Sequence, residues 1–357
     1  MHDEGEIIFR SATPNDAGAI ARVHVAAWQH SYRSIIDESF LAALDPADNK
    51  MTWVDQLTRA GSDSSIVLVA EAQSDGICGF ASGGAARRDW GADAELYAIY
   101  LMPDRQRRGV GRLLCRELGT QLFADGFESL VVWVLAANPA RGFYEALGGE
   151  VIRERDVEIG AQRLREVAYA WPKLTDFVNR TYRGANDEAP IEIVTYDPAW
   201  PALFEAEREL LAVTLRRWLV GPIEQVGSTA VPGLAAKPVI DIMAAVESLD
   251  ASRGALGVLR DAGYHYAPYR ADLMHWFCKA SPSFRTHHLH LVPYRSGLWS
   301  ERIAFRDCLR SDPAIAREYA DLKYRLAVAH RFDREAYADG KGPFVTGVVR
   351  KFLAGEA

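Results

Sequence analysis

A short stretch near residue 100 joins a strand pattern, a basic loop with two glycines and a helix pattern, and this order constrains the fold of the first half of the chain. Residues 96–101 are apolar, aromatic and β-branched, which predicts a buried strand that ends at Pro103. After Gly111, leucines recur every three or four residues as far as Leu122, which predicts an amphipathic helix. A strand that leads through a short loop into a helix is typical of an α/β domain.

The loop itself, residues 106–111, combines positive charge with backbone freedom. Glycines allow backbone N–H groups to approach a ligand closely, and a helix N-terminus concentrates unpaired donors and partial positive charge. The loop therefore predicts a diphosphate site, and the alternative is an ordinary solvated turn. It does not continue into the Gly-Lys-Ser/Thr of a P-loop, and it lacks the Gly-x-Gly-x-x-Gly of a dinucleotide fold.

The stretch resembles the acetyl-CoA signature of the GNAT acetyltransferase superfamily, Gln/Arg-x-x-Gly-x-Gly/Ala, with matches at Gln106, Gly109 and Gly111. A second similarity to GNAT proteins follows the expected fifth strand, with matches at Asn138, Tyr144 and Gly148. The resemblance implies a GNAT mixed-sheet domain over residues 1–172. It also implies acetyl-CoA as cofactor and transfer of the acetyl group to an amine by direct attack on the thioester.

By this resemblance, the end of the central strand, the basic loop and the asparagine segment form the acetyl-CoA site. The residues expected to bind are Ile99, Tyr100, Leu101, Gln106, Arg107, Arg108, Gly109, Val110, Gly111, Arg112, Asn138 and Tyr144. Backbone N–H groups near residues 99–101, where the strand is expected to separate from its neighbour, would polarise the thioester carbonyl.

Tyr144 is the expected catalytic acid. A tyrosine hydroxyl, with an ordinary pKa of about 10, can protonate the thiolate that leaves when the tetrahedral intermediate collapses. The alternative is that Phe143, Tyr144 and Leu147 only form one packed face of a helix.

Glu95 is the expected general base, because an alkylammonium group must lose a proton before its nitrogen can attack. The resemblance places a glutamate here that acts through water, and the alternative is a solvated strand end. Asp89 and Asp93 point to a cationic acceptor, and we expect a small-molecule amine. Three aromatic side chains would line the acceptor side or belong to the core: Trp28, Tyr32 and Trp53.

The chain changes character after residue 172. Residues 183–190 are polar, contain turn-forming residues and show no apolar period. We therefore expect a linker over residues 173–189, with a short helix at its start, and a second domain over residues 190–357.

The second domain carries the more distinctive pattern, Gln-Val-Gly-Ser-Thr-Ala-Val-Pro-Gly-Leu, followed by Lys-Pro-Val-Ile-Asp-Ile. This pattern is similar to that of the GrpB family, and the similarity extends over nearly all of residues 190–355. It implies a nucleotidyltransferase-like fold, so the expected fold class is α/β with two domains, a GNAT fold followed by a GrpB fold. The residues expected at its ligand site are Gly227, Ser228, Lys237, Asp241, His288 and His290.

The activity of this domain is left open by the sequence. Nucleotidyltransferases bind two metals through Asp-x-Asp, and Met243 stands where the second carboxylate would be. Asp241, His288 and His290 could bind one softer divalent metal, or the lysine and histidines could hold a phosphate, or the group could be a structural polar cluster. We expect a nucleotide or phosphorylated small molecule as ligand. The rival interpretations are an active metal-dependent nucleotidyltransferase, a non-catalytic substrate-recognition module, and an acetyl-CoA sensor without turnover.

Composition sets the remaining limits. The chain has 357 residues and a formal net charge of −7, which argues against nucleic acid as a partner. Four widely spaced cysteines predict reduced core thiols, and no apolar segment is long enough to span a membrane. We therefore expect a cytoplasmic protein that does not bind membranes, and the sequence does not define its oligomeric state.

Overall fold

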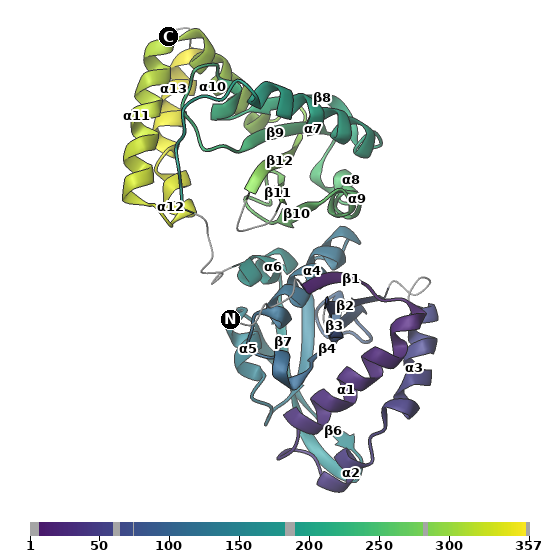
Figure 1. Cartoon of the computed structure of the whole chain (residues 1–357). Helices are drawn as coiled ribbons and strands as arrows, with labels where there is room; N and C mark the ends of the chain where they lie inside the picture. Colours follow the sequence, from purple (N-terminus) through teal and green to yellow (C-terminus); the bar gives the residue numbers. More distant parts are fainter. Residues whose placement is uncertain (1–6, 60–64, 74, 183–189, 281–284, 355–357) are drawn as a thin grey trace. The chain divides into compact units, whose positions relative to one another are not determined.

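The structure is a computed structural model that describes residues 7–59, 65–73, 75–182, 190–280 and 285–354. The chain forms two compact units, Met1–Arg183 and Gly184–Ala357 (Figure 1). The expectation of two α/β domains with mixed sheets is confirmed. Residues 183–189 of the expected linker lie outside the described residues.

The N-terminal unit is built on a seven-stranded sheet with the order β1-β2-β3-β4-β5-β7-β6. Its strands are β1 (Ile7–Ser11), β2 (Ile66–Ala72), β3 (Gly76–Ala85), β4 (Ala94–Leu101), β5 (Leu130–Leu135), β6 (Glu150–Ile159) and β7 (Gln162–Trp171). Neighbouring strands are antiparallel except for β4 and β5, which are parallel. The β6–β7 pair forms an antiparallel hairpin at one edge of the sheet.

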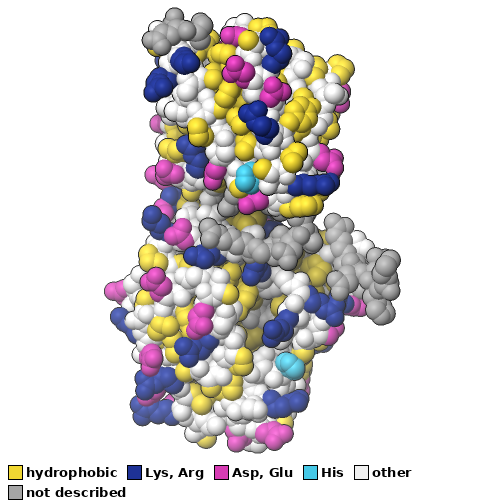
Figure 2. Space-filling view, turned by 90° about the vertical axis from the view of Figure 1, so that its left-hand side faces the viewer, with side chains coloured by type: hydrophobic (Ala, Val, Ile, Leu, Met, Phe, Trp, Pro, Cys, Tyr) yellow, Lys and Arg dark blue, Asp and Glu magenta, His cyan; other side chains and the backbone are white. Residues whose placement is uncertain are grey.

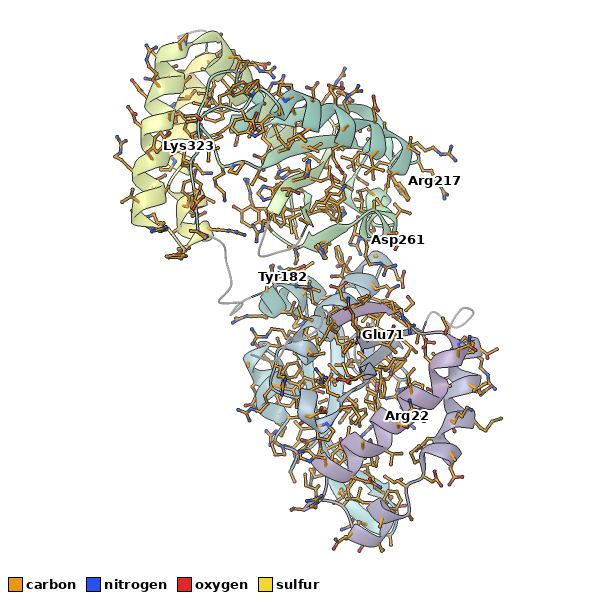
Figure 3. All side chains as sticks on the ribbon, viewed as in Figure 1. Arg22, Glu71, Tyr182, Arg217, Asp261 and Lys323 are labelled. Atoms are coloured by element: carbon orange, nitrogen blue, oxygen red, sulfur yellow. The ribbon has the colours of Figure 1, made fainter. Side chains whose placement is uncertain are left out.

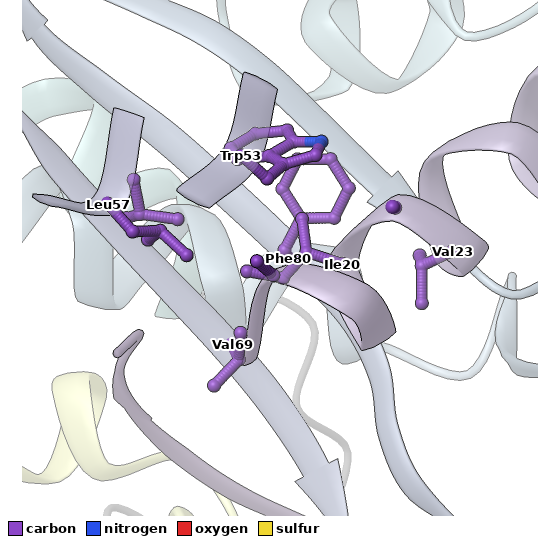
Figure 4. Close-up of a cluster of buried hydrophobic side chains, with 9 residues drawn as sticks. Ile20, Val23, Trp53, Leu57, Val69 and Phe80 are labelled. Carbon is purple, nitrogen blue, oxygen red and sulfur yellow. The ribbon is translucent and has the colours of Figure 1, made fainter. Parts of the chain in front are cut away.

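Helices cover both faces of this sheet. They are α1 (Ala17–Ser31), α2 (Glu38–Ala42), α3 (Pro46–Arg59), α4 (Val110–Ala124), α5 (Arg141–Ala146) and α6 (Leu174–Tyr182). Phe80 of β3 packs with Ile20 and Trp53 in the core beneath α1 and α3 (Figure 4). Because side chains alternate along a strand, Gly79 and its neighbours at odd positions face the other side, toward α4.

Helix α6 belongs to the N-terminal unit, although its residues fall within the expected linker. It packs against α4, where a Cβ atom at Gly119 would lie only 2.8 Å from Val178 and 3.0 Å from Phe177. Glycine at this position therefore allows the two helices to approach closely.

The C-terminal unit is built on a five-stranded sheet with the order β10-β11-β12-β9-β8. Its strands are β8 (Leu219–Val226), β9 (Ile240–Val246), β10 (Tyr264–Ala267), β11 (His275–Ala280) and β12 (Arg285–Pro293). Only β12 and β9 pair in parallel. This pairing places His288 beside Asp241 and His290 beside Met243.

The helices of this unit are α7 (Trp200–Thr214), α8 (Leu249–Ser252), α9 (Ala255–Asp261), α10 (Gly297–Ser311), α11 (Pro313–Ala329), α12 (Arg334–Asp339) and α13 (Gly342–Leu353). Phe305 of α10, Tyr319 of α11 and Val349 of α13 share one apolar cluster. Lys323, labelled on α11 in Figure 3, is 1% exposed within this helical layer.

The four cysteines are free and buried, as predicted. No helix in the described part of the chain is both long and apolar enough to cross a membrane. Basic and acidic side chains are interspersed on the face of each unit seen in Figure 2, without a large region of one sign.

Candidate functional site

The basic loop of the N-terminal unit ends at a helix N-terminus, as the sequence predicts. Arg107 and Gly109 have positive φ angles of 60° and 86°, and α4 begins at Val110. The Leu113 N–H donates to the Gly109 carbonyl at 3.1 Å, so the N–H groups of the preceding helical residues lie in the first turn, before intrahelical bonding begins. Arg107 and Arg108 are exposed, while Gln106 donates to the Leu101 carbonyl at 3.3 Å and fixes the loop to β4.

Strands β4 and β5 separate next to this loop. Their parallel pairing stops at Leu96 and Val132, although both strands continue beyond these residues. On its other side, β4 stays paired with β3, with a bulge at Tyr97, and the Met102 N–H donates to the Cys78 carbonyl. The alternation of this antiparallel ladder directs the N–H groups of Ile99 and Leu101 toward the gap beside β5. The N–H of Tyr100 faces β3 instead.

Tyr144 of α5 is 6% exposed and interacts electrostatically with Tyr100 of β4. Its ring packs against those of Phe143 and Tyr169, with centroids 5.5 and 6.0 Å apart, so Tyr144 is part of a packed aromatic group. Burial raises the pKa of its hydroxyl well above the ordinary value, and Cys115 is a close electrostatic neighbour.

Asn138 precedes α5 and is also buried. Its Oδ1 accepts a hydrogen bond from the Ala140 N–H at 2.9 Å, which fixes the turn that starts the helix. Tyr32 lies beside Asn138, and the Tyr32 hydroxyl is 3.4 Å from that of Tyr100. The polar ends of these side chains therefore meet near the end of β4.

Glu95 is 1% exposed, so the interpretation of it as a solvated strand end is wrong. The Arg87 guanidinium donates to both carboxylate oxygens, and the Arg87 backbone N–H donates to Oε2 at 3.2 Å. The Asp93 carboxylate accepts hydrogen bonds from the backbone N–H groups of Glu128 and Ser129, each at 2.8 Å, and so stabilises the chain before β5. Asp89 accepts from the Gly91 N–H in an exposed bend.

The aromatic side chains that the sequence assigns to the acceptor side or the core surround a histidine that sequence reasoning missed. His24 of α1 stacks on Tyr100 with centroids 5.0 Å apart and meets Trp28 and Trp53 edge to face. Its Nδ1 is buried without a hydrogen-bond partner, and burial lowers its pKa to about 4. A histidine four residues before Trp28 on a helix was the available signal, since this spacing places both on one face. Trp53 and Tyr32 are buried core residues, and Trp28 is partly exposed.

The expected ligand residues of the C-terminal unit meet at Asp241. His288 Nδ1 lies 2.9 Å from Asp241 Oδ1, and His290 Nε2 lies 3.8 Å from the same oxygen. Gly227 has a φ angle of 71°, and a Cβ atom added to it would lie 2.4 Å from Asp241 Oδ2. Glycine is therefore required here by both the backbone angle and the adjacent carboxylate.

Arg302 of α10 also reaches this cluster, although it was not among the ligand-site residues expected from the sequence. Its Nη1 lies 3.2 Å from His290 Nδ1, and its Nη2 lies 3.7 Å from Met274 Sδ. An arginine only donates, so His290 Nδ1 accepts and Nε2 carries the hydrogen, which points toward Asp241. Burial and the nearby Arg302 charge lower the pKa of His290 to about 3, so this ring is neutral at pH 7.

Lysines approach the same carboxylate from two other segments. Lys237 precedes β9, Lys341 precedes α13, and both interact electrostatically with Asp241. The Lys237 and Lys341 ammonium groups lie 5.5 and 4.4 Å from the centroid of the Tyr337 ring. Burial and neighbouring cations lower the pKa of Lys237 to about 8. Ser228 hydrogen-bonds with Tyr319 at the edge of the cluster.

The cluster is not arranged as a divalent-metal site, which the sequence left as one of several possibilities. Within the described ranges, no three His, Cys, Asp or Glu side chains are arranged to hold a metal ion. His288 uses Nδ1 to bond Asp241, and Met243 is fully buried in the apolar core where a second carboxylate would be needed. A separate pocket of 440 Å³ contains the Val231–Leu234 segment of the family pattern and Arg310, and none of the cluster residues line it.

Comparisons with known proteins agree with the two folds. Residues 83–157 match the family of FR47-like proteins, and residues 190–351 match the family described as GrpB protein. An uncharacterized N-acetyltransferase from Bacillus subtilis, YuaI, is 37% identical over 47% of this chain and 95% of its own length. Glutamate-rich protein GrpB from Alkalihalophilus pseudofirmus is 35% identical over 46% of this chain and 97% of its own length.

A third relative, the UPF0157 protein YqkA of Bacillus subtilis, is 28% identical over 247 residues, which cover 69% of this chain and 66% of YqkA. Neither structural unit contains that many residues, so the similarity extends across the boundary between them. The chain therefore belongs to two families at once, with an N-terminal domain of the GNAT N-acetyltransferase superfamily and a C-terminal domain of the GrpB family.

Proposed function

We propose that the N-terminal domain transfers an acetyl group from acetyl-CoA to a small-molecule amine, which attacks the thioester directly. The observation that carries this proposal is the gap between β4 and β5, with the N-terminus of α4 beside it. The N–H groups of Ile99 and Leu101 would hold the acyl carbonyl and the chain that bears it. The loop from Gln106 to Arg112 would bind the diphosphate, because helix N-terminal N–H groups and arginines both favour that charge.

Tyr144 is the proposed acid. Its hydroxyl is protonated at neutral pH, as a proton donor must be, and burial raises its pKa further above the ordinary value. As the tetrahedral intermediate collapses, the C–S bond breaks, its electron pair stays on sulfur, and the hydroxyl proton is donated to the thiolate.

Glu95 is the proposed base, acting through water on the acceptor ammonium group. It lies on β4, the strand that also presents Ile99 and Leu101. The Arg87 guanidinium donates to both oxygens of the Glu95 carboxylate. As general base, Glu95 would therefore accept the proton of the acceptor ammonium group while it is paired with Arg87. Arg87 therefore positions Glu95 and becomes part of the proposed acceptor side.

The experiment measures release of free thiol from acetyl-CoA against a panel of amines, with the full-length protein. We expect turnover with a small amine and a loss of about 10²–10⁴-fold in kcat for Tyr144→Phe. Tyr182→Phe on α6 is the matched control, because it removes a hydroxyl from the same unit and leaves the Arg116 contact with the ring. Full turnover by Tyr144→Phe would refute the assignment of the acid, and failure to bind CoA would refute the cofactor site.

We also propose that the C-terminal domain binds a nucleotide or another phosphorylated small molecule. The specific observation in favour is the approach of Lys237, Lys341 and Arg302 to the single carboxylate of Asp241. Cationic side chains that outnumber their acidic partners favour an anionic ligand. If the C-terminal domain presents the amine substrate to the N-terminal domain, a variant that no longer binds the ligand of the C-terminal domain should have a higher KM for the amine. If the two domains act independently, that KM should not change.

A further inference from the structure

We infer that the C-terminal domain holds the phosphoryl group of its ligand with its own basic side chains, Lys237, Arg302 and Lys341, and without a divalent metal. This inference rests on the proposed binding of a phosphorylated ligand and adds how the charge of that ligand is neutralised. In a fold where metal ions would hold the phosphates, side chains of the loop before β9, of α10 and of the start of α13 would replace them.

The first argument is that the acidic centre is already occupied. Asp241 Oδ1 accepts a hydrogen bond from His288 Nδ1 at 2.9 Å, and His290 Nε2 lies 3.8 Å from the same oxygen, beyond hydrogen-bond distance. Asp241 Oδ2 lies so close to Gly227 that a Cβ atom there would clash with it. A divalent ion would need further oxygen ligands, and the neighbouring inward position on β9 is Met243. A thioether in an apolar core is a poor ligand for Mg²⁺.

The second argument is that Arg302 has only neutral acceptors. Its recorded partners are a neutral histidine nitrogen and a thioether sulfur, both weak substitutes for a carboxylate. Among the residues that the structure describes, no carboxylate forms an ion pair with Arg302. Burial lowers its pKa, which shows that the surroundings do not fully compensate its charge. A planar guanidinium that is buried without a carboxylate partner is suited to bind a phosphate through two N–H groups.

The third argument is that Lys237 and Lys341 also lack a carboxylate partner. The ammonium groups of Lys237 and Lys341 both lie over the ring of Tyr337, and neither forms an ion pair with a described carboxylate. Burial and, to a smaller extent, neighbouring cations lower the pKa of each lysine, and Asp241 is the acidic group that acts on both. Each lysine therefore keeps an ammonium group that lacks a direct anionic partner.

The cationic side chains of the cluster outnumber its carboxylates. Lys237, Arg302 and Lys341 all act electrostatically with Asp241, and the ring of His290 is neutral. A phosphate monoester carries about −1.5 to −2 charges at pH 7 and would neutralise this excess. Lys323, whose ammonium donates to the Ala235 carbonyl, is a further cation next to Lys341.

The test is calorimetric titration of the full-length protein with inorganic phosphate and with ATP, in EDTA and in Mg²⁺. Saturating CoA is present throughout, so that the loop before α4 is blocked. We expect dissociation constants in EDTA within about twofold of those in Mg²⁺. Arg302→Gln and Lys341→Gln should each weaken binding at least about tenfold, which is the loss expected for one charge-assisted contact.

Two matched controls and one rescue separate charge from folding. Arg317→Gln on α11 and Lys351→Gln on α13 change exposed residues of the same types and should leave binding unchanged. Lys341→Arg keeps the positive charge and should retain binding that Lys341→Gln loses. Binding that appears only with Mg²⁺ would overturn the metal-free inference and leave the proposed ligand class standing. Absence of binding by either probe, with and without metal, would overturn both, and binding unchanged in Arg302→Gln and Lys341→Gln would overturn the assigned residues.

Discussion

The buried histidine of the acceptor side should make the N-terminal domain sensitive to mild acid. His24 has no hydrogen-bond partner for Nδ1 and is enclosed by the rings of Trp28, Trp53, Phe80 and Tyr100. A charged imidazolium is poorly solvated there, and its pKa falls from 6.5 to about 4.

The size of the effect follows from proton linkage. Below pH 6.5 the imidazole of His24 takes up a proton in the unfolded chain but not in the folded chain. The free energy of unfolding therefore keeps its full value above pH 6.5 and decreases as the pH falls toward 4. With these two pKa values, lowering the pH from 7 to 5 reduces the free energy of unfolding by about 2 kcal/mol, and complete protonation of both states would reduce it by about 3 kcal/mol.

Comparison with His24→Phe isolates this contribution, because phenylalanine fills a similar volume among the same rings and does not titrate. Hydrogen exchange of α1 peptides, measured by mass spectrometry at pH 7 and pH 5, reports the opening free energy of this unit separately from the other. The wild type should lose about 2 kcal/mol more than the variant over this interval. Equal losses in both proteins would refute the argument that a buried neutral imidazole controls the acid sensitivity.

Two further substitutions test contacts described above. Gly119→Val should lower the free energy of unfolding of the N-terminal unit by about 1–3 kcal/mol in urea, because the added atoms would clash with Val178 of α6. Gly142→Ala is the control and should cause no loss, because a Cβ atom at this position meets no atom within 4 Å. Arg87→Gln should cost about 1–3 kcal/mol, because it leaves the buried carboxylate of Glu95 without its charged partner. The double variant with Glu95→Gln should recover part of that loss, and additive losses in the double-mutant cycle would show that the two side chains do not interact.

Local sequence patterns were sufficient to predict those parts of the candidate site that a single continuous segment of the chain forms. The strand, the loop and the helix around Gly109 follow from apolar runs, glycines and leucine spacing, which are properties of neighbouring residues. Partners set by tertiary packing were not predictable in this way. Arg87 meets Glu95 only because β3 and β4 pair across a bulge, and Arg302 meets His290 only because α10 returns over the sheet.

The same reason explains the placement of α6. Its apolar face could be recognised as part of a domain only together with Gly119, which is more than fifty residues away in the chain. The roles proposed for Tyr144, Glu95 and the lysines stay predictions, because they depend on ligands and on proton transfers rather than on the fold alone.

The separation of β4 from β5 has a consequence for how this protein can vary. The groups presented to the gap are main-chain N–H groups of Ile99 and Leu101, and these groups are the same for every amino acid except proline. Replacement of a side chain along this edge leaves the recognition surface in place, so its sequence is free to change with the packing needs of the core. An alanine scan would therefore leave the proposed acyl contacts unchanged, whereas a proline at either position would remove one of the proposed donors.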